Sequence, residues 1–243
     1  MQMKRVLPIL ACALVSSPAL ALDIIFEYDD SNAFFTDERR DALERAASFY
    51  EDYITNNLNV IVTLDTTVDT STLLAWGGTS DIANFQYDWI GGITFNESPN
   101  WYSGTSENFS GYDFFSVTLH ELGHILGVGI VDTWMTHVSE GYFYGENAVN
   151  VYGGRVPVTA SGDHWLDGTK STLPGTETWQ VTSYDPYFSD GQRLYLTDLD
   201  LAGLQDIGWS VASSVPEPEM LYMLLAGLGI VGLGTRRRRR IVA

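Results

Sequence analysis

The sequence predicts a single α+β domain between an N-terminal leader and a C-terminal tail. Short β-type segments and one helical pattern come first, and two further helical patterns follow, without internal repeats. The chain has 243 residues, of which 45% are hydrophobic and 18% are charged. This composition is typical of a folded domain, and it excludes a disordered chain and a membrane protein with many spans.

The clearest patterns lie in the first 94 residues of the chain. Residues 24–26 and 59–64 are rich in apolar and β-branched side chains, which predicts two short strands. Between them, residues 37–54 carry apolar side chains at helical spacing, behind Thr36 as a candidate N-cap. Residues 82–94 are aromatic and interrupted by a glycine pair, which predicts one or two further strands.

Two shorter helices are predicted downstream. Residues 114–126 are strongly apolar and follow Asp113, a candidate N-cap. Residues 197–207 form the last helix, which begins with a capping box made by Thr197 and Asp200. Both patterns are followed directly by a glycine, which is the usual signal for the end of a helix.

Two segments have the composition of loops. Residues 95–112 consist mainly of Asn, Ser, Gly and Tyr, and residues 128–196 have many Gly, Asp, Thr and aromatic side chains but little periodicity. A structureless stretch as long as 128–196 is uncommon in a compact domain. It therefore indicates either a functional region or elements that the pattern does not reveal.

The N-terminus has the layout of a secretory signal peptide, over residues 1–21. Lys4 and Arg5 precede an apolar run at residues 6–15, and the small-residue site Ala19-Leu20-Ala21 follows. The single cysteine of the chain, Cys12, lies inside this segment. The exported protein is therefore expected to contain no disulfide and no thiol chemistry.

The C-terminus has three consecutive parts. Residues 210–219 are a linker that contains Pro216-Glu217-Pro218, residues 220–235 are apolar, and residues 236–243 begin with five arginines. This arrangement resembles the PEP-CTERM sorting signal of Gram-negative bacteria. The resemblance implies an exosortase-type sorting machinery, transient anchoring in the inner membrane with the basic tail in the cytoplasm, and delivery to the cell surface or extracellular matrix.

The domain between these ends is strongly acidic. Residues 22–215 hold 29 acidic and six basic side chains, a net charge of −23. Because such a body repels phosphate backbones, the sequence argues against a nucleic-acid partner. Structural calcium in acidic loops is conceivable at Asp29, Asp30, Asp163, Asp167 and Asp190, but their spacing matches no recognised calcium loop, and a solvated acidic surface is the favoured interpretation.

One motif in the second predicted helix carries chemistry. Residues 120–124 read His120-Glu121-Leu122-Gly123-His124, which is H-E-x-x-H. Histidines four apart share one helix face, so both imidazoles can bind one Zn²⁺ ion. Glu121 lies beside them, where it can act as the catalytic general base towards water.

The residues around this motif resemble the metzincin metallopeptidases, in a matrixin- or leishmanolysin-like form. The match to H-E-x-x-H-x-x-G continues through Gly127, whereas Ile130 occupies the place of the third histidine. The His-Trp pair within residues 161–165 and the last helix, within residues 196–209, also resemble this family. The resemblance implies a metzincin-like catalytic domain over residues 22–209, with a small mixed sheet, an active-site helix and a C-terminal helix.

A catalytic zinc needs a third protein ligand. The leishmanolysin-like context of residues 161–165 implies that His164 joins His120 and His124 in binding the metal. His137, a site without a third protein ligand, and an oxygen ligand from Asp132 are the alternatives that the sequence leaves open. For His137, a solvated loop position is the favoured interpretation.

The sequence departs from the metzincins at the methionine that lies under the zinc. Tyr184 stands where the resemblance places that methionine. Simple packing of an aromatic ring is the favoured interpretation, and a hydrogen bond from Tyr184 or Tyr187 to an oxyanion is the alternative.

The sequence therefore predicts an exported zinc metalloendopeptidase that acts on protein or peptide substrates. In this hypothesis Glu121 activates water and then returns the proton to the leaving amine. The first alternative is a non-catalytic surface or matrix protein that keeps the fold. The second is a zinc hydrolase that acts on a substrate other than a peptide.

Overall fold

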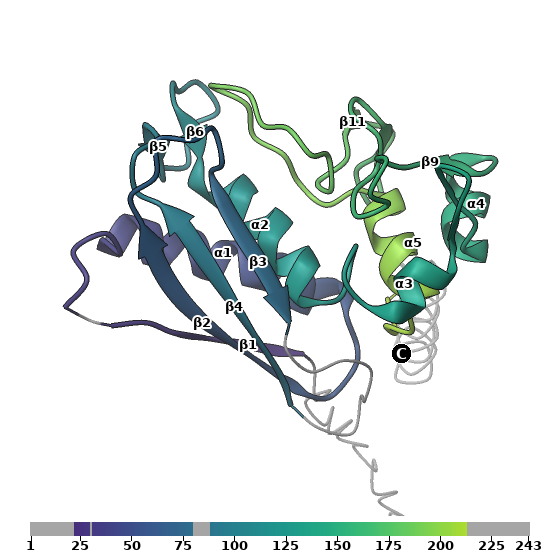
Figure 1. Ribbon diagram of the computed structural model, residues 1–243, viewed down its shortest axis with the longest axis horizontal. Coiled ribbons are helices and arrows are strands. Elements are labelled where there is room, and N and C mark those ends of the chain that lie inside the picture. Colours follow the sequence, from purple (N-terminus) through teal and green to yellow (C-terminus); the bar gives the residue numbers. More distant parts are fainter. Residues whose placement is uncertain (1–21, 30, 80–87, 213–243) are drawn as a thin grey trace, which may run out of the picture.

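A four-stranded sheet forms one side of the protein in the computed structural model, which describes residues 22–29, 31–79 and 88–212. The strand order is β1 (Asp23–Glu27), β2 (Asn59–Thr67), β4 (Trp89–Asn96) and β3 (Ala75–Thr79). The first three strands are parallel, and β3 pairs antiparallel with β4 at the edge (Figure 1). The predicted signal peptide and most of the C-terminal tail lie outside the described residues.

Two helices, α1 (Asp37–Tyr53) and α2 (Phe114–Ile125), cover one face of this sheet (Figure 1). The strands present alternating side chains to the helices, so that Val60, Val62 and Leu64 are buried. The other face is open to solvent and exposes Ile25, Trp76 and Ile90. The sheet and the two helices thus form two layers, with the core between them.

The second half of the chain is built from much shorter elements. Its helices are α3 (Asp132–Thr136), α4 (Glu146–Tyr152) and α5 (Asp198–Asp206). Its strands are β7 (Val138–Ser139), β8 (Tyr142–Phe143), β9 (Val156–Pro157), β10 (Lys170–Thr172) and β11 (Trp179–Val181). A further two-stranded ladder, β5 (Trp101–Tyr102) with β6 (Tyr112–Asp113), lies directly before α2.

The three predicted helices and their caps are confirmed. Thr36 accepts a hydrogen bond from the backbone amide of Arg39, and Asp113 accepts one from the amide of Ser116. At α5, Thr197 and Asp200 form the complete capping box. These caps satisfy backbone amides that have no partner inside a helix.

The predictions for several other segments are wrong or incomplete. One or two strands were predicted over residues 82–94: residues 82–87 lie outside the described part, and residues 89–94 belong to one strand, β4, which continues to Asn96. Strand β3 was not predicted, because two of its five residues are glycines. Residues 95–112 and 128–196 are not simply loops, since they hold short elements that tertiary contacts stabilise.

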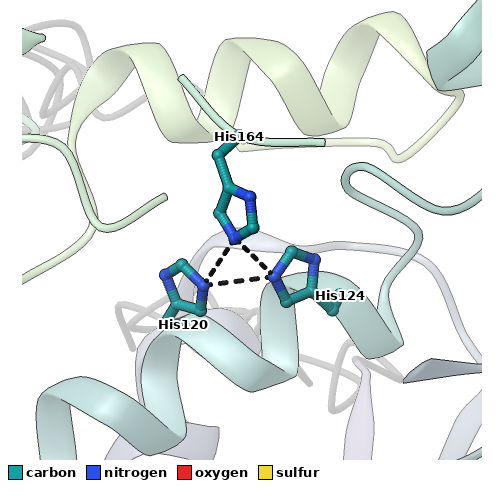
Figure 2. A group of neighbouring side chains, drawn as sticks. All are labelled: His120, His124 and His164. Atoms are coloured by element: carbon teal, nitrogen blue, oxygen red, sulfur yellow. Dashed lines mark hydrogen bonds between the residues drawn. The ribbon is translucent and has the colours of Figure 1, made fainter. Parts of the chain in front are cut away.

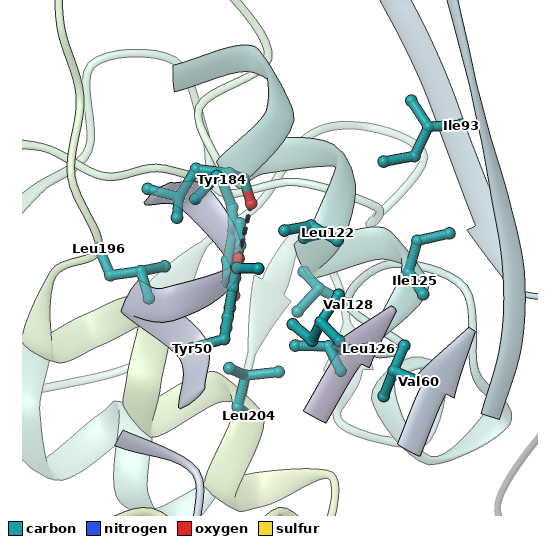
Figure 3. Close-up of a cluster of buried hydrophobic side chains, with 14 of the residues drawn as sticks. Tyr50, Val60, Ile93, Leu122, Ile125, Leu126, Val128, Tyr184, Leu196 and Leu204 are labelled. Atoms are coloured by element: carbon teal, nitrogen blue, oxygen red, sulfur yellow. Dashed lines mark hydrogen bonds between the residues drawn. The ribbon is translucent and has the colours of Figure 1, made fainter. Parts of the chain in front are cut away.

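One hydrophobic core joins the two halves of the chain. It runs from Leu22 on the sheet side to Trp209 after α5. The indole of Trp209 donates a hydrogen bond to the carbonyl of Leu126, over 2.7 Å, at the end of α2. Figure 3 shows how the core side chains of α2 lie between the sheet and α5. Residues 22–209 therefore share a continuous core, and the mixed α+β class is confirmed.

Candidate metal centre

Helix α2 runs through the core, and all twelve of its residues are buried. Its N-cap, Asp113, is held by Arg193, whose Nη2 and Nε lie 2.8 and 2.9 Å from the two carboxylate oxygens. A bidentate charge pair at a helix N-terminus fixes both the position and the direction of the helix. His120 and His124, four residues apart, consequently point from one face of a firmly held helix.

A third histidine meets them from a distant part of the chain. His164 lies between β9 and β10, and its Nε2 atom is 3.1 Å from that of His120 and 3.0 Å from that of His124. The two helical Nε2 atoms are themselves 3.1 Å apart. Figure 2 shows the three rings pointing toward one another. Within the described residues, this is the one group of three or more His, Cys, Asp or Glu side chains able to hold a metal ion.

The opposite nitrogen of each ring faces a hydrogen-bond acceptor. The Nδ1 atom of His120 is 2.8 Å from the carbonyl of Ser183, and that of His124 is 2.8 Å from the carbonyl of Val128. Nδ1 of His164 is 2.9 Å from the carboxylate of Asp163. A carbonyl or carboxylate oxygen only accepts, so each Nδ1 carries a proton, and Nε2 is the nitrogen that presents a lone pair when the ring is neutral.

Burial keeps the imidazoles of His120 and His124 neutral. Burial first, and then repulsion from His124 and His164, hold the pKa of His120 well below its ordinary value. Burial, followed by repulsion from His164, lowers the pKa of His124 to about 4. At pH 7 the lone pairs of neutral imidazoles therefore converge, an arrangement that is unfavourable without a cation between them.

The spacing of these nitrogens suits zinc. Zn–N distances of 2.0–2.1 Å in a tetrahedral site correspond to N···N separations of about 3.3 Å. The observed separations of 3.0–3.1 Å lie close to that value. Three neutral imidazoles are also the donor set of a catalytic zinc that keeps one position open.

Glu121 lies next to this group and has an unusual environment. Its side chain is buried, and its Oε2 atom has no hydrogen-bond partner. Burial raises the pKa of this carboxyl to about 8, against the opposing effect of the backbone amide of Gly77. A buried carboxyl with one free oxygen is available to accept and donate a proton.

The histidines and Glu121 open onto a cleft of about 470 Å³. Its lining includes the edge strand β3 with the residues before it, and Tyr187 and Phe188. Gly77 of β3 lies so close to Glu121 that a Cβ atom there would be 2.9 Å from Oε2. The glycines that obscured β3 in the sequence thus allow this strand to approach the acidic side chain.

A turn at residues 182–185 packs against the group of three histidines and contacts His120. The buried carboxylate of Asp200 accepts the amide of Ser183 over 2.9 Å and the indole N–H of Trp165 over 3.1 Å. Ser183 orients His120, and Trp165 follows His164 in the chain. Asp200, which completes the capping box of α5, therefore also fixes the turn that orients His120 and the residue that follows His164.

Tyr184 occupies the underside of the site as a packing residue. Its ring is fully buried, and its hydroxyl is 3.2 Å from that of Tyr50, which in turn donates to the carbonyl of Leu119 (Figure 3). The hypothesis that Tyr184 binds an oxyanion is therefore wrong. Tyr187, by contrast, is exposed and lines the cleft, so its proposed role stays a prediction.

The alternative third ligands lie elsewhere. His137 packs against Phe143, and its Nε2 is 3.1 Å from the carbonyl of Asp206. Asp132 begins α3 with an exposed side chain, and Ile130 lines the cleft. No second cluster suited to a cation, such as calcium, exists among the described residues.

Sequence reasoning missed three residues that shape the centre: Asp163, Asp200 as more than a cap, and Gly77. Asp163 adjoins the predicted ligand His164, which is a usable signal because metal-binding histidines usually have an acceptor on their other nitrogen. The contacts of Asp200 and Gly77 link residues far apart in the chain, so no local sequence pattern predicts them.

Comparison with known proteins supports the prediction made for the C-terminal tail. Residues 214–239 match the PEP-CTERM protein-sorting motif, which exosortase-type machinery recognises and which implies export with C-terminal membrane-anchored sorting. No curated protein matches the chain. Over the described residues, none of the helices has both the length and the apolar character that crossing a bilayer requires.

Proposed function

We propose that this exported protein is a zinc-dependent metalloendopeptidase with a metzincin-like fold. The observation that carries the proposal is the convergence of three Nε2 lone pairs, from His120, His124 and His164, beside the buried carboxyl of Glu121. Each part has a function in peptide hydrolysis: three neutral ligands, an adjacent proton carrier and an open cleft.

The residues present fit the metal, and they divide the chemistry. His120, His124 and His164 would hold zinc, which supplies a Lewis acid that polarises a carbonyl and acidifies water. Glu121 accepts the proton of the attacking water and delivers it to the leaving amine. Its partnerless Oε2 atom suits a group that must both take up and release a proton.

The edge strand supports a peptide as the substrate. Strand β3 ends the sheet, and residues 75–77 of this strand line the cleft. An extended peptide can pair with the last strand of a sheet through main-chain hydrogen bonds. This mode of binding recognises a stretch of backbone, which favours cleavage within a chain.

Several features support the metzincin-like identity. The mixed sheet, the helix with H-E-x-x-H and the C-terminal helix occur in the expected order. Gly127 has a φ of 105°, and a Cβ atom there would lie 2.7 Å from Val131, so the turn after α2 requires glycine. The chain then leaves the site at Ile130 and supplies its third histidine from residue 164.

The alternative is a non-catalytic surface or matrix protein that keeps the fold. The sorting motif and Tyr184, in place of a methionine, favour this alternative. The burial of Glu121 argues against it, because a buried carboxyl without a full set of partners costs stability and has no structural use here. A zinc hydrolase that acts on other bonds shares the same residues.

A peptide-library digest tests the proposal. Zinc-loaded protein comprising residues 22–212 should cleave the library, and a matched Glu121→Gln variant should lose about 1,000-fold in rate. This variant keeps the shape of the side chain and should retain its zinc. Cleavage of model esters without cleavage of any peptide would identify the other hydrolase, whereas a zinc-bound protein inert to both would identify the non-catalytic alternative.

A further inference from the structure

The third histidine is held in a different way from the other two. His120 and His124 belong to a helix, whereas His164 lies in the connection between β9 and β10, outside any helix or strand. The backbone hydrogen bonds of a helix fix the direction of its side chains, but a connecting segment lacks this support. Something else must therefore aim the ring of His164.

The carboxylate of Asp163 is placed to do so. Its Oδ1 atom lies 2.9 Å from Nδ1 of His164. The same oxygen accepts hydrogen bonds from the hydroxyls of Thr159 and Ser161, both over 2.6 Å. Oδ1 of Asp163 thus contacts three side chains of the six-residue segment 159–164. It links the imidazole of His164 to the segment that carries it.

The backbone of this segment is itself closed. The amide of Thr159 donates to the carbonyl of His164 over 3.1 Å, and the amide of Gly162 donates to the carbonyl of Thr159 over 3.0 Å. The buried side chain of Trp134 also holds the segment, because its indole N–H donates to the carbonyl of Gly162 over 2.8 Å. A Cβ atom at Gly129 would lie 2.1 Å from the carbonyl oxygen of Asp163, so the turn after α2 also packs directly against it.

The chemistry of the three Nδ1 contacts also differs. His120 and His124 donate to neutral carbonyls, whereas His164 donates to a carboxylate. A carboxylate at this position fixes the tautomer of the ring and makes its other nitrogen a better donor to a metal. The histidine with the weakest backbone support thus has the strongest acceptor.

We propose that Asp163 is the positioning residue of the third metal ligand: it holds His164 through Nδ1 and so directs Nε2 into the centre. This inference rests on the proposed metal site. It assigns to the short segment 159–164 the task that helix α2 performs for the other two histidines. It also gives Thr159 and Ser161 a function, since their hydroxyls keep the carboxylate in place.

Zinc affinity, measured by competition with a chromogenic chelator, tests this proposal. Asp163→Ala removes the acceptor and should weaken zinc binding by roughly 10- to 100-fold. Asp163→Asn keeps an Oδ1 acceptor for all three donors, so its smaller loss, about 10-fold, measures the contribution of the charge. Asp167→Asn removes an equal charge from an exposed position three residues beyond His164 and should leave the affinity unchanged.

Cobalt provides a readout that a merely structural role would not move. The visible absorption of Co²⁺ bound to the wild-type protein should have the intensity of a four-coordinate site. In Asp163→Ala this absorption should weaken and shift, while Asp163→Asn should stay close to wild type. The melting temperature of the metal-free Asn variant should lie between those of the metal-free wild type and Ala variant, because the hydrogen bonds persist without their charge.

The outcomes separate this inference from the proposed function. Wild-type affinity and an unchanged cobalt spectrum in both variants would overturn the role of Asp163 and leave the metal centre intact. Failure of the wild-type protein itself to bind zinc would overturn both proposals. If the Ala variant does not fold, the Asn variant decides alone, and a zinc affinity equal to wild type would overturn the role of the charge.

Discussion

The two halves of the molecule build their parts of the site by different means. Apart from the two-residue strands β5 and β6, the described residues up to 126 form long elements, with helices of 17 and 12 residues against a four-stranded sheet. Residues 127–212 have helices of five, seven and nine residues and strands of only two or three. The first half places His120 and His124 through the repeated backbone hydrogen bonds of a helix, whereas the second places His164 through a short segment held by a few backbone bonds and by the Asp163 carboxylate. Precision in the second half therefore depends on a few irreplaceable residues.

The largest expected effect concerns the ligands themselves. If both halves contribute equally to the centre, His164→Ala and His120→Ala should weaken zinc binding to the same extent. One third of the roughly 10–16 kcal/mol available from a zinc site corresponds to a loss of about 300- to 8,000-fold per ligand. His137→Ala is the matched control, because this histidine lies outside the group. Isothermal titration or chelator competition measures the zinc affinity of all three variants. A zinc affinity of His164→Ala equal to that of the wild type would show that the second half contributes no ligand.

The second effect tests how far the short elements depend on one buried carboxylate. Asp200→Asn replaces an acceptor by a group with two donors, opposite the amides of Ser183 and Thr197. We expect a loss of about 2–3 kcal/mol in the free energy of unfolding, measured with urea. Asp198→Asn keeps an acceptor for Thr172 and should cost less than about 0.5 kcal/mol. Equal losses in the two variants would show that Asp200 is only a cap.

A third effect probes the contact between the halves beneath the histidines. A Cβ atom at Gly123 would lie 2.2 Å from Cε1 of Tyr184. Gly123→Ala should therefore destabilise the protein by about 1–2 kcal/mol, although alanine is the better helix former. In a Tyr184→Leu background, whose side chain is shorter, the same change should be neutral or stabilising. A double-mutant cycle in urea measures this coupling, and additive effects would contradict it.

The smallest effect lies in the regular half. Thr36 caps α1 through a long hydrogen bond of 3.4 Å to the amide of Arg39. Thr36→Ala should cost only about 0.5 kcal/mol, at the lower end for an N-cap. Thr36→Ser keeps the hydroxyl and serves as the control. A loss as large as that of Asp200→Asn would erase the distinction between a local cap and one with long-range contacts.

The same distinction explains what the sequence could predict. The helices with H-E-x-x-H and with the capping box follow local patterns, so their positions and caps were predicted correctly. The resemblance of residues 161–165 to the metzincins pointed to His164, which the structure brings to the other two histidines. Strand β3 could not be predicted, since its glycines have low β propensity and its stability comes from pairing with β4. The short strands β8 and β9 pair across 13 to 15 residues, and two residues each are too few to show a periodic pattern in the sequence.

The separation between the histidines has a consequence for the integrity of the whole chain. His124 and His164 are 40 residues apart, so an ion shared between them closes a large covalent loop much as a disulfide does. Closing a flexible loop of that length costs the unfolded chain about 3 kcal/mol of entropy, a cost that the cross-link removes from folding. The single cysteine of the sequence, Cys12, lies in the predicted leader. A metal ion bound by the three imidazoles would thus give the domain the kind of cross-link that other secreted proteins obtain from disulfides.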